Sequence, residues 1–231
     1  NIDAEISTLE LFARCSYEHP DLPEDFHQAM SRQASDEARH AAACIALAAH
    51  YGVPHGTYPT STDVYDFHYE YAPCKPGSRR ELLWRLLLRS TFQEALSLDG
   101  FVTLNARLAH DRAYDAARLL ESLMADEVFH VESGLKWARY LCNGNDDRVF
   151  TERAKAHRYY VMAQHRARKA YVKAHPDEAI RETEQLWQLH EQSRTRYPFD
   201  LGVHLARDTR RRIGFSERDL EQVLDWGYAL D

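Results

Sequence analysis

A short motif occurs twice in this sequence, at residues 36–40 and 126–130. Each copy has an aspartate, a glutamate and, three residues after the glutamate, a histidine. Residues three apart lie on one face of a helix, one turn from each other, so Glu37 and His40 form one pair and Glu127 and His130 another. Such a pair can bind a metal ion, and its recurrence in one chain is hard to obtain by chance.

A similar segment precedes each motif. Residues 5–12 resemble residues 94–101, with matches at five of eight positions. Each segment begins with a glutamate, 32 or 33 residues before the glutamate of its motif. Two helix hairpins related in this way place four carboxylates and two imidazoles around a pseudo-twofold axis, which is the ligand set of carboxylate-bridged dinuclear iron or manganese proteins. The predicted metal ligands are Glu5, Glu37, His40, Glu94, Glu127 and His130.

The chemistry of these residues favours a metal site over ion pairs on the surface. Four carboxylates that face inward from four helices repel one another and are costly to bury unless cations neutralise them. Oxygen and nitrogen ligands without cysteine suit iron or manganese better than structural zinc. The alternative is that these residues form ion pairs on the surface, but the same spacing would then have to occur twice without a shared function. We therefore expect two iron ions, or one manganese and one iron.

Residues beside the ligands have predicted supporting roles. We expect Asp36 and Asp126 each to hold the histidine of the opposite hairpin, since a metal-bound imidazole needs a partner for its other nitrogen. The alternative is an acid that faces solvent. Thr8 and Ser97 lie one turn after the first glutamates, and their hydroxyls either hydrogen-bond a ligand on the metals or bond back to their own helix. The candidate catalytic residues are Glu37, Glu127, Thr8 and Ser97.

The two halves differ one turn beyond each ligand histidine, where the first has Cys44 and the second has Gly134. Glycine inside a helix costs about 1 kcal/mol relative to alanine, so we expect a local reason for it. Gly134 either opens space beside one metal or permits close contact with another helix. Phe12 and Phe101 are expected in the core. Three later histidines could add a ligand, although ordinary surface or core positions are favoured: His157, His165 and His190.

Apolar residues recur at three- and four-residue spacing almost throughout, which predicts helices. The predicted helices are residues 2–18, 24–51, 80–110, 113–142, 147–175, 177–195 and 201–212, and one opened by Ser216. Two hairpins joined by one long crossover, residues 52–77, are the wiring of a ferritin-like four-helix bundle. We therefore predict an all-α fold: a bundle with the metal site over residues 1–145, and a C-terminal helical extension over residues 146–231, packed on the bundle within the same domain.

Charge along the chain argues against a general nucleic-acid binder. The 231 residues carry a net charge of −7, whereas binding to nucleic acid depends on neutralising phosphates. Residues 151–218 hold 15 basic and 9 acidic residues. We interpret this basic stretch as a solvated helix face. The alternative is contact with an anion or an RNA through Arg210, Arg211 and Arg212.

Composition also bears on the cellular compartment in which the protein is expected. The longest apolar run, residues 41–49, is far shorter than the ~20 residues that cross a membrane. Four cysteines without a CxxC pair argue against a zinc ribbon and a disulfide scaffold, and favour a reducing, cytoplasmic compartment. The sequence begins at Asn1 without a methionine or a signal-peptide pattern, so we expect missing upstream residues rather than secretion.

With these residues in place, the chain resembles the ferritin-like superfamily and, more narrowly, the bacterial family named domain of unknown function 455. The resemblance rests on residues 5–12, the two motifs and a tail, which departs from the family pattern at Asp200, where we expect asparagine. The tail residues are Pro198, Phe199, Asp200, Ala206, Arg207, Arg212, Ile213, Gly214 and Phe215. The resemblance implies a dinuclear iron fold and says little about substrate.

We therefore expect a cytoplasmic oxidoreductase, a monooxygenase or oxidase whose dinuclear iron centre uses O₂ to hydroxylate or N-oxygenate a small organic molecule. Such a reaction needs electrons from outside, and thus a separate reductase. We expect a small oligomer such as a homodimer, no membrane partner and no nucleic acid. Two alternatives remain: an iron-binding protective protein whose only activity is oxidation of Fe(II), and a tRNA-modifying hydroxylase.

Overall fold

The computed structural model describes residues 2–57, 68, 73–198 and 205–227, and none of these belongs to a β-strand. The predicted all-α fold is therefore confirmed. In chain order the helices are α1 (Ile2–Glu18), α2 (Glu24–His50), α4 (Arg79–Arg85), η2 (Leu86–Gln93), α5 (Glu94–His110), α6 (Tyr114–Leu141), α7 (Asp146–Ala174), α8 (Pro176–Arg196), α9 (Arg207–Ile213) and α10 (Glu217–Gly227).

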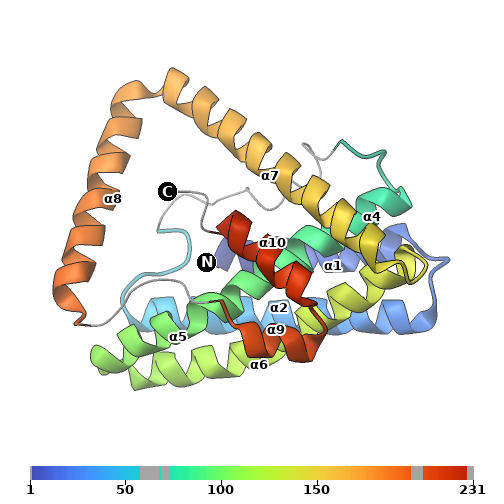
Figure 1. Ribbon diagram of the computed structural model, residues 1–231. Coiled ribbons are helices and arrows are strands. Elements are labelled where there is room, and N and C mark those ends of the chain that lie inside the picture. The colour runs from blue at the N-terminus through green and yellow to red at the C-terminus, as the bar shows by residue number, and fades with distance from the viewer. Residues whose placement is uncertain (1, 58–67, 69–72, 199–204, 228–231) are drawn as a thin grey trace.

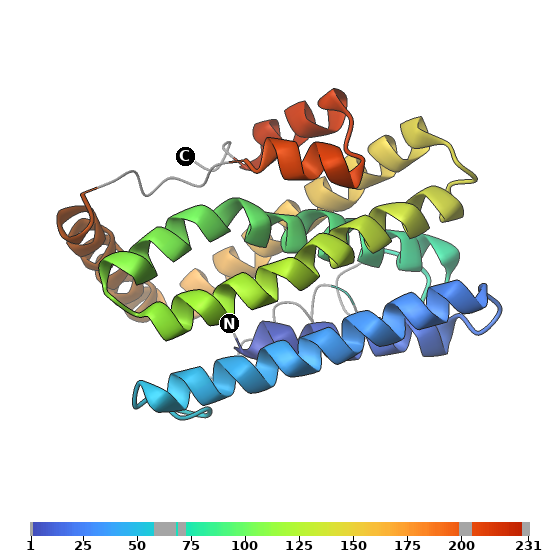
Figure 2. The ribbon, with the colours of Figure 1, turned by 90° about the horizontal axis from the view of Figure 1, so that it is seen from below.

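Four long helical segments form a bundle (Figure 1). They are α1, α2, the continuous segment α4–η2–α5, and α6. Helix α1 packs along α2, and α6 packs along α5 and η2. Figure 2 shows these two pairs as adjacent layers, which α2 and α6 join by direct contact. The two halves of the sequence repeat thus lie in opposite layers and face each other.

Short connections with defined backbone geometry set these hairpins. At the end of α6, Asn143 and Gly144 both have positive φ, which glycine and asparagine adopt more readily than other residues. Asn145 then caps α7, because its side-chain oxygen accepts a hydrogen bond from the Arg148 N–H.

The segment α4–η2 runs through the centre of the molecule, and every residue from Glu81 to Phe92 is buried. Its leucines serve two cores. Leu83 and Leu87 pack with residues of α5, α6 and the C-terminal helices, whereas Leu82 and Leu86 pack with residues of α1 and α2. A helix that is buried on all sides is one that the fold surrounds, so this segment positions whatever follows it along the chain.

Two predicted boundaries are corrected. The helix predicted over residues 80–110 is present, but its part Leu86–Gln93 is a π-helix. The helix predicted over residues 201–212 begins only at Arg207; residues 205 and 206 are not helical, and residues 201–204 lie outside the described part of the chain, as does most of the crossover.

The C-terminal helices cover the α5–α6 layer on the side away from α1 and α2 (Figure 2). Arg210 of α9 is fully buried and forms a two-pronged ion pair with Asp99 of α5, through Nη2–Oδ2 at 2.6 Å and Nε–Oδ1 at 3.1 Å. Arg153 of α7 is also buried and pairs with Asp219 of α10. The expectation that the basic stretch is a solvated face is therefore wrong for these two arginines, which fasten helices together.

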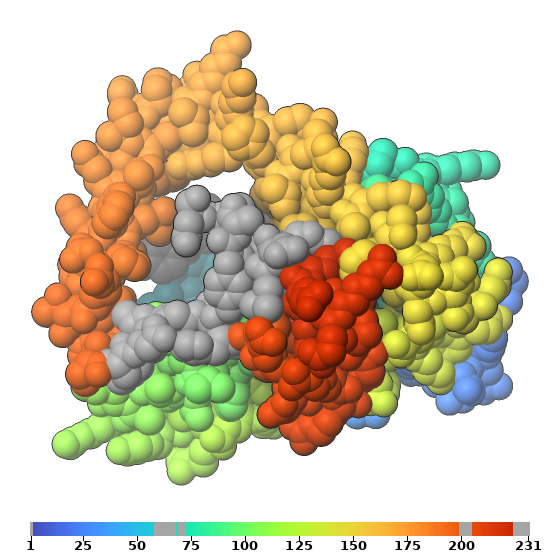
Figure 3. All heavy atoms as spheres, in the orientation of Figure 1, coloured from blue at the N-terminus to red at the C-terminus, as the bar shows by residue number. Residues whose placement is uncertain are grey.

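Helix α8 has a different setting. Figure 3 shows it projecting from the rest of the molecule, and its main helix contact is with α7. Ile180, Leu186, Trp187 and Leu189 are each more than half exposed along it. None of the helices in the described ranges is long and apolar enough to cross a membrane.

Candidate metal centre

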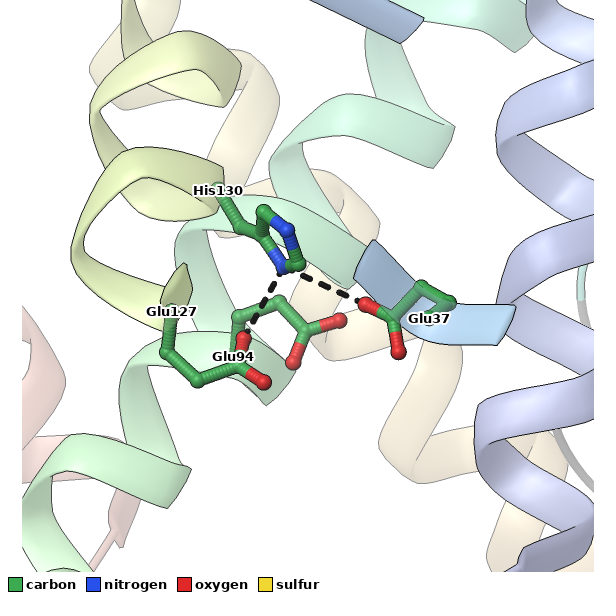
Figure 4. A group of neighbouring side chains, drawn as sticks. All are labelled: Glu37, Glu94, Glu127 and His130. Carbon is green, nitrogen blue, oxygen red and sulfur yellow. Dashed lines mark hydrogen bonds and ion pairs between the residues drawn. The ribbon is translucent and has the colours of Figure 1, made fainter. Parts of the chain in front are cut away.

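The six predicted ligands come together inside the bundle as two clusters that share one residue. Glu37, Glu94, Glu127 and His130 form the first cluster, in which every residue is buried (Figure 4). The second consists of Glu5, Glu37 and His40. Within each cluster one ligand atom from every residue lies within 4.8 Å of the others. Glu37 belongs to both, so it can lie between two ions.

Both motif glutamates reach both histidines. The Nδ1 atom of His40 is 3.5 Å from Glu37 Oε2 and 3.4 Å from Glu127 Oε1. The Nδ1 atom of His130 is 3.2 Å from Glu37 Oε1 and 3.1 Å from Glu127 Oε2. Each carboxylate therefore presents one oxygen to each imidazole. Two carboxylates placed in this way could be shared by two ions, whereas Glu5 and Glu94 each belong to one cluster alone.

The aspartate of each motif holds the histidine of the other motif. His40 Nε2 lies 3.2 Å from Asp126 Oδ2, and His130 Nε2 lies 3.3 Å from Asp36 Oδ2. The predicted crosswise pairing is confirmed. Because the aspartate accepts a hydrogen bond from Nε2, it fixes the ring and directs Nδ1 toward the glutamates. Arg39 joins the two aspartates, at 2.9 Å from Asp36 and 2.8 Å from Asp126.

Protons and metal ions compete for the same ring nitrogens. Burial alone would lower the pKa of His40, but hydrogen bonds to ligand glutamates raise this pKa to about 12. The pKa of His130 rises to about 10 against the same effect of burial. Burial would raise the pKa of Glu127, but hydrogen bonds from both histidines lower it to about 2. A metal ion that binds at neutral pH must therefore displace imidazole protons.

The residues fit a pair of divalent ions. Both oxygens of Glu37 are buried, and each contacts the Nδ1 atom of one histidine, Oε1 that of His130 at 3.2 Å and Oε2 that of His40 at 3.5 Å. A buried carboxylate with so few partners is costly, and a cation beside it lowers that cost. Ligand atoms that each lie about 2.1 Å from one ion are roughly 3 to 4 Å apart, which is the spacing between the histidine Nδ1 atoms and the bridging carboxylates.

The hydroxyl residues are placed differently from the ligands. Thr8 is buried, and its hydroxyl donates a hydrogen bond to the Ala4 carbonyl of the preceding turn. This is the second of the two roles expected from the sequence, and it commits the hydroxyl proton to the helix backbone. Ser97 is half-buried on α5, one turn after Glu94. The catalytic role predicted for these two residues stays a prediction.

Gly134 allows close contact between α6 and the π-helix. A Cβ atom at this position would lie 2.2 Å from the Ser90 Cβ, far inside van der Waals contact. Of the two reasons expected from the sequence, close helix packing is therefore the one observed. Phe12 is a core residue as expected, and its ring meets that of His130 edge to face, with 6.0 Å between centroids.

The three later histidines are not among the clustered ligands. His157 is buried beside the Phe92 ring, at 4.6 Å between centroids. His165 and His190 are exposed on α7 and α8. Phe101, expected in the core, is only half-buried.

Sequence reasoning missed Arg89. This buried side chain of η2 places its Nε atom 2.7 Å from Glu94 Oε1. Burial raises the pKa of Glu94 well above its usual value, and the charge of Arg89 acts in the opposite direction. The repeat gave no signal for Arg89, because the matched segments begin at Glu5 and Glu94 themselves. Its one sequence signal is a charged residue within an apolar helix.

The molecule is thus an all-α bundle with a buried glutamate–histidine cluster of the kind that can hold metal. The chain belongs to the family described as protein of unknown function (DUF455), whose sequence profile matches residues 2–180. That match contains all six ligands and ends before the tail included in the expected resemblance. No curated protein and no solved structure matches the chain.

Proposed function

We propose that the chain is a ferritin-like dinuclear metal enzyme that uses O₂ to oxidise a small organic molecule. The observation that carries this proposal is the sharing of Glu37 and Glu127 between two histidines, because bridging carboxylates are what a dinuclear centre needs and a mononuclear one does not. The pairing of two helix hairpins supports the ferritin-like wiring.

The bound metals would be two iron ions, or one manganese and one iron, and they would supply the electrons and the Lewis acidity that O₂ reduction requires. Glu37 and Glu127 would be shared by the two ions, Glu5 and His40 would hold one of them, and Glu94 and His130 would hold the other. The Glu5 side chain is 21% exposed and that of Glu94 only 3%. A small substrate and O₂ therefore approach from the Glu5 side, while the Glu94 side excludes water.

The reaction proposed is hydroxylation or N-oxygenation. Either reaction consumes two external electrons for each O₂, so the proposal includes a separate reductase or a chemical reductant. A homodimer is the proposed assembly. Of the three arginines on which the tRNA-hydroxylase alternative depends, Arg210 is buried against Asp99, whereas Arg211 and Arg212 are exposed.

The test is the metal content of the purified protein, as isolated and after anaerobic loading with Fe(II). We expect about two metal ions per chain. A Glu37→Ala/Glu127→Ala double variant, shown by circular dichroism to be helical, is the control and loses both ions. O₂ consumption with an added reductant then reports turnover.

Three results would overturn the proposal. Less than about 0.3 ion per chain after loading would remove the dinuclear centre itself. Many irons per chain, held in a large hollow oligomer, would instead support the iron-storage alternative. O₂ consumed only in proportion to added Fe(II), without turnover, would leave a centre that only oxidises iron.

A further inference from the structure

The two metal positions have nearly the same ligands but different surroundings. The outer ligand of one, Glu94, is paired with Arg89 through Nε and Oε1 at 2.7 Å. The outer ligand of the other is Glu5, and among the described residues its ion-pair partner is His40, itself a ligand. Within the part of the chain that the structure describes, the outer glutamate of one half is thus paired with a buried arginine and that of the other half is not.

The π-helix is what places Arg89 beside Glu94. In an α-helix, with 3.6 residues per turn, side chains five residues apart point about 140° away from each other. A π-helix hydrogen-bonds residue i to residue i+5 and brings such a pair close to alignment. The Glu94 N–H donates to the Arg89 carbonyl, so these two residues are themselves joined by a hydrogen bond of this type.

Arg89 cannot move its charge away. Its side chain is buried, and arginine keeps its proton at any ordinary pH. Its positive charge acts most strongly on Glu94 and then on Glu37, Glu5 and Glu127.

We propose that Arg89 makes the two metal positions unequal, so that the Glu5–His40 position fills first and the Glu94–His130 position holds the second ion more weakly. This inference rests on the proposed dinuclear centre. A fixed positive charge repels a divalent ion at short range, and that repulsion is strong where water is excluded. The difference allows a mixed centre with two different metals to form by ordered addition.

The test is a titration of the metal-depleted protein with Mn(II), followed by electron paramagnetic resonance. A single bound Mn(II) gives a six-line signal, and a second ion nearby couples to it and removes that signal. For the wild type we expect nearly one mononuclear Mn(II) per chain at one equivalent, and its loss on approach to two equivalents. A mononuclear signal of about 0.9 per chain requires the two dissociation constants to differ by roughly 300-fold, whereas a tenfold difference gives only about 0.6.

Arg89→Met should make the positions equal. One ion distributed over two equal positions gives a mononuclear signal about half as large at one equivalent. Arg85→Met is the matched control, since Arg85 is equally buried one turn earlier but pairs with Glu18 and Glu81, away from the ligands. This control should keep the wild-type titration. Arg89→Lys, which keeps the charge, should keep it too.

Two single-ligand variants test the order of filling without altering Arg89. Glu94→Ala should retain one tightly bound Mn(II), and Glu5→Ala should retain only the weaker one. A half-sized signal in the wild type at one equivalent would overturn the inference and leave the dinuclear proposal intact. The same holds if Arg89→Met, folded by its thermal transition, titrates as the wild type does. Failure of the wild type to bind Mn(II), Fe(II) or Co(II) would overturn both.

Discussion

The two hairpins offer the same ligands from two different environments. In the first, the outer glutamate is partly exposed and α1 and α2 form a plain pair of α-helices. In the second, the outer glutamate is sealed by Arg89, and the helix before it is wound as a π-helix that lies against Gly134. Repetition of the cluster residues therefore does not make the two halves equal. The second half, whose outer glutamate is the more buried, is also the half that contains the π-helix and its close contact with Gly134.

The largest expected effect is on metal content, when removal of a shared ligand is compared with removal of an unshared one. Glu37→Ala removes a carboxylate common to both positions, so metal content after Fe(II) loading should fall from about two ions per chain to below about 0.3. Glu5→Ala affects one position only and should leave about one ion. Elemental analysis of both variants measures this. Equal losses in the two variants would show that the positions do not act separately.

A second comparison uses pH. The pKa values of His40 and His130 lie at about 12 and about 10, so both imidazoles are protonated at neutral pH before an ion binds. Loading then releases at least these two imidazole protons, and overall affinity should rise at least about 100-fold per pH unit between pH 6 and 8. A pH indicator in weakly buffered solution counts the protons during Mn(II) addition. Release of less than half a proton would contradict the assignment of these imidazoles.

The crosswise aspartates provide a third comparison. Asp126→Asn and Asp36→Asn each weaken the hold on the histidine of the opposite half, and each should lower metal affinity by about 10- to 100-fold. Asp126→Asn should affect the position of His40 and Asp36→Asn that of His130. Competition with a chelator gives the affinities. If both variants bound metal with wild-type affinity, the prediction would be wrong, and the role of the aspartates would be limited to their ion pairs with Arg39.

The smallest expected effect concerns packing in the second half. Gly134→Ala puts a Cβ 2.2 Å from that of Ser90 and should destabilise the protein by about 1–3 kcal/mol. Gly100→Ala is the control, because a Cβ at Gly100 has no neighbour within 4 Å, and it should stabilise by about 0.5–1 kcal/mol. Urea unfolding compares the two. Ser90→Gly should restore most of the loss in the first variant, and no recovery would contradict the contact.

The sequence was sufficient for the helices and for the ligands because both follow local periodicity. The spacing of Glu37 and His40 within one turn already places them on one face, and the repeat supplies the matching face. The crosswise role of Asp36 and Asp126 also followed, since a ligand imidazole needs a partner and few candidates lie nearby.

The parts that could not be predicted depend on contacts distant in sequence or on a change of helical winding. Arg210 looked like one of several surface arginines, and only its pairing with Asp99, 111 residues away, shows that it is internal. Arg89 stands five residues before Glu94, a spacing that ordinary α-helical geometry assigns to different faces. No local pattern in Leu86–Gln93 announces the π-helix that changes this.

The hydrogen bond between His40 and Asp126 also sets an order of events during synthesis. These residues are 86 positions apart, which ribosomes translating at about 5–20 residues per second cover in about 4 to 17 s. During that interval the nascent first hairpin exposes Glu5, Glu37 and His40 without Glu127 or the aspartate that fixes the ring. An ion captured then would have the ligands of one half only. The six residues of the clusters can therefore come together only after residues 126–130 have been synthesised and have folded against the first hairpin.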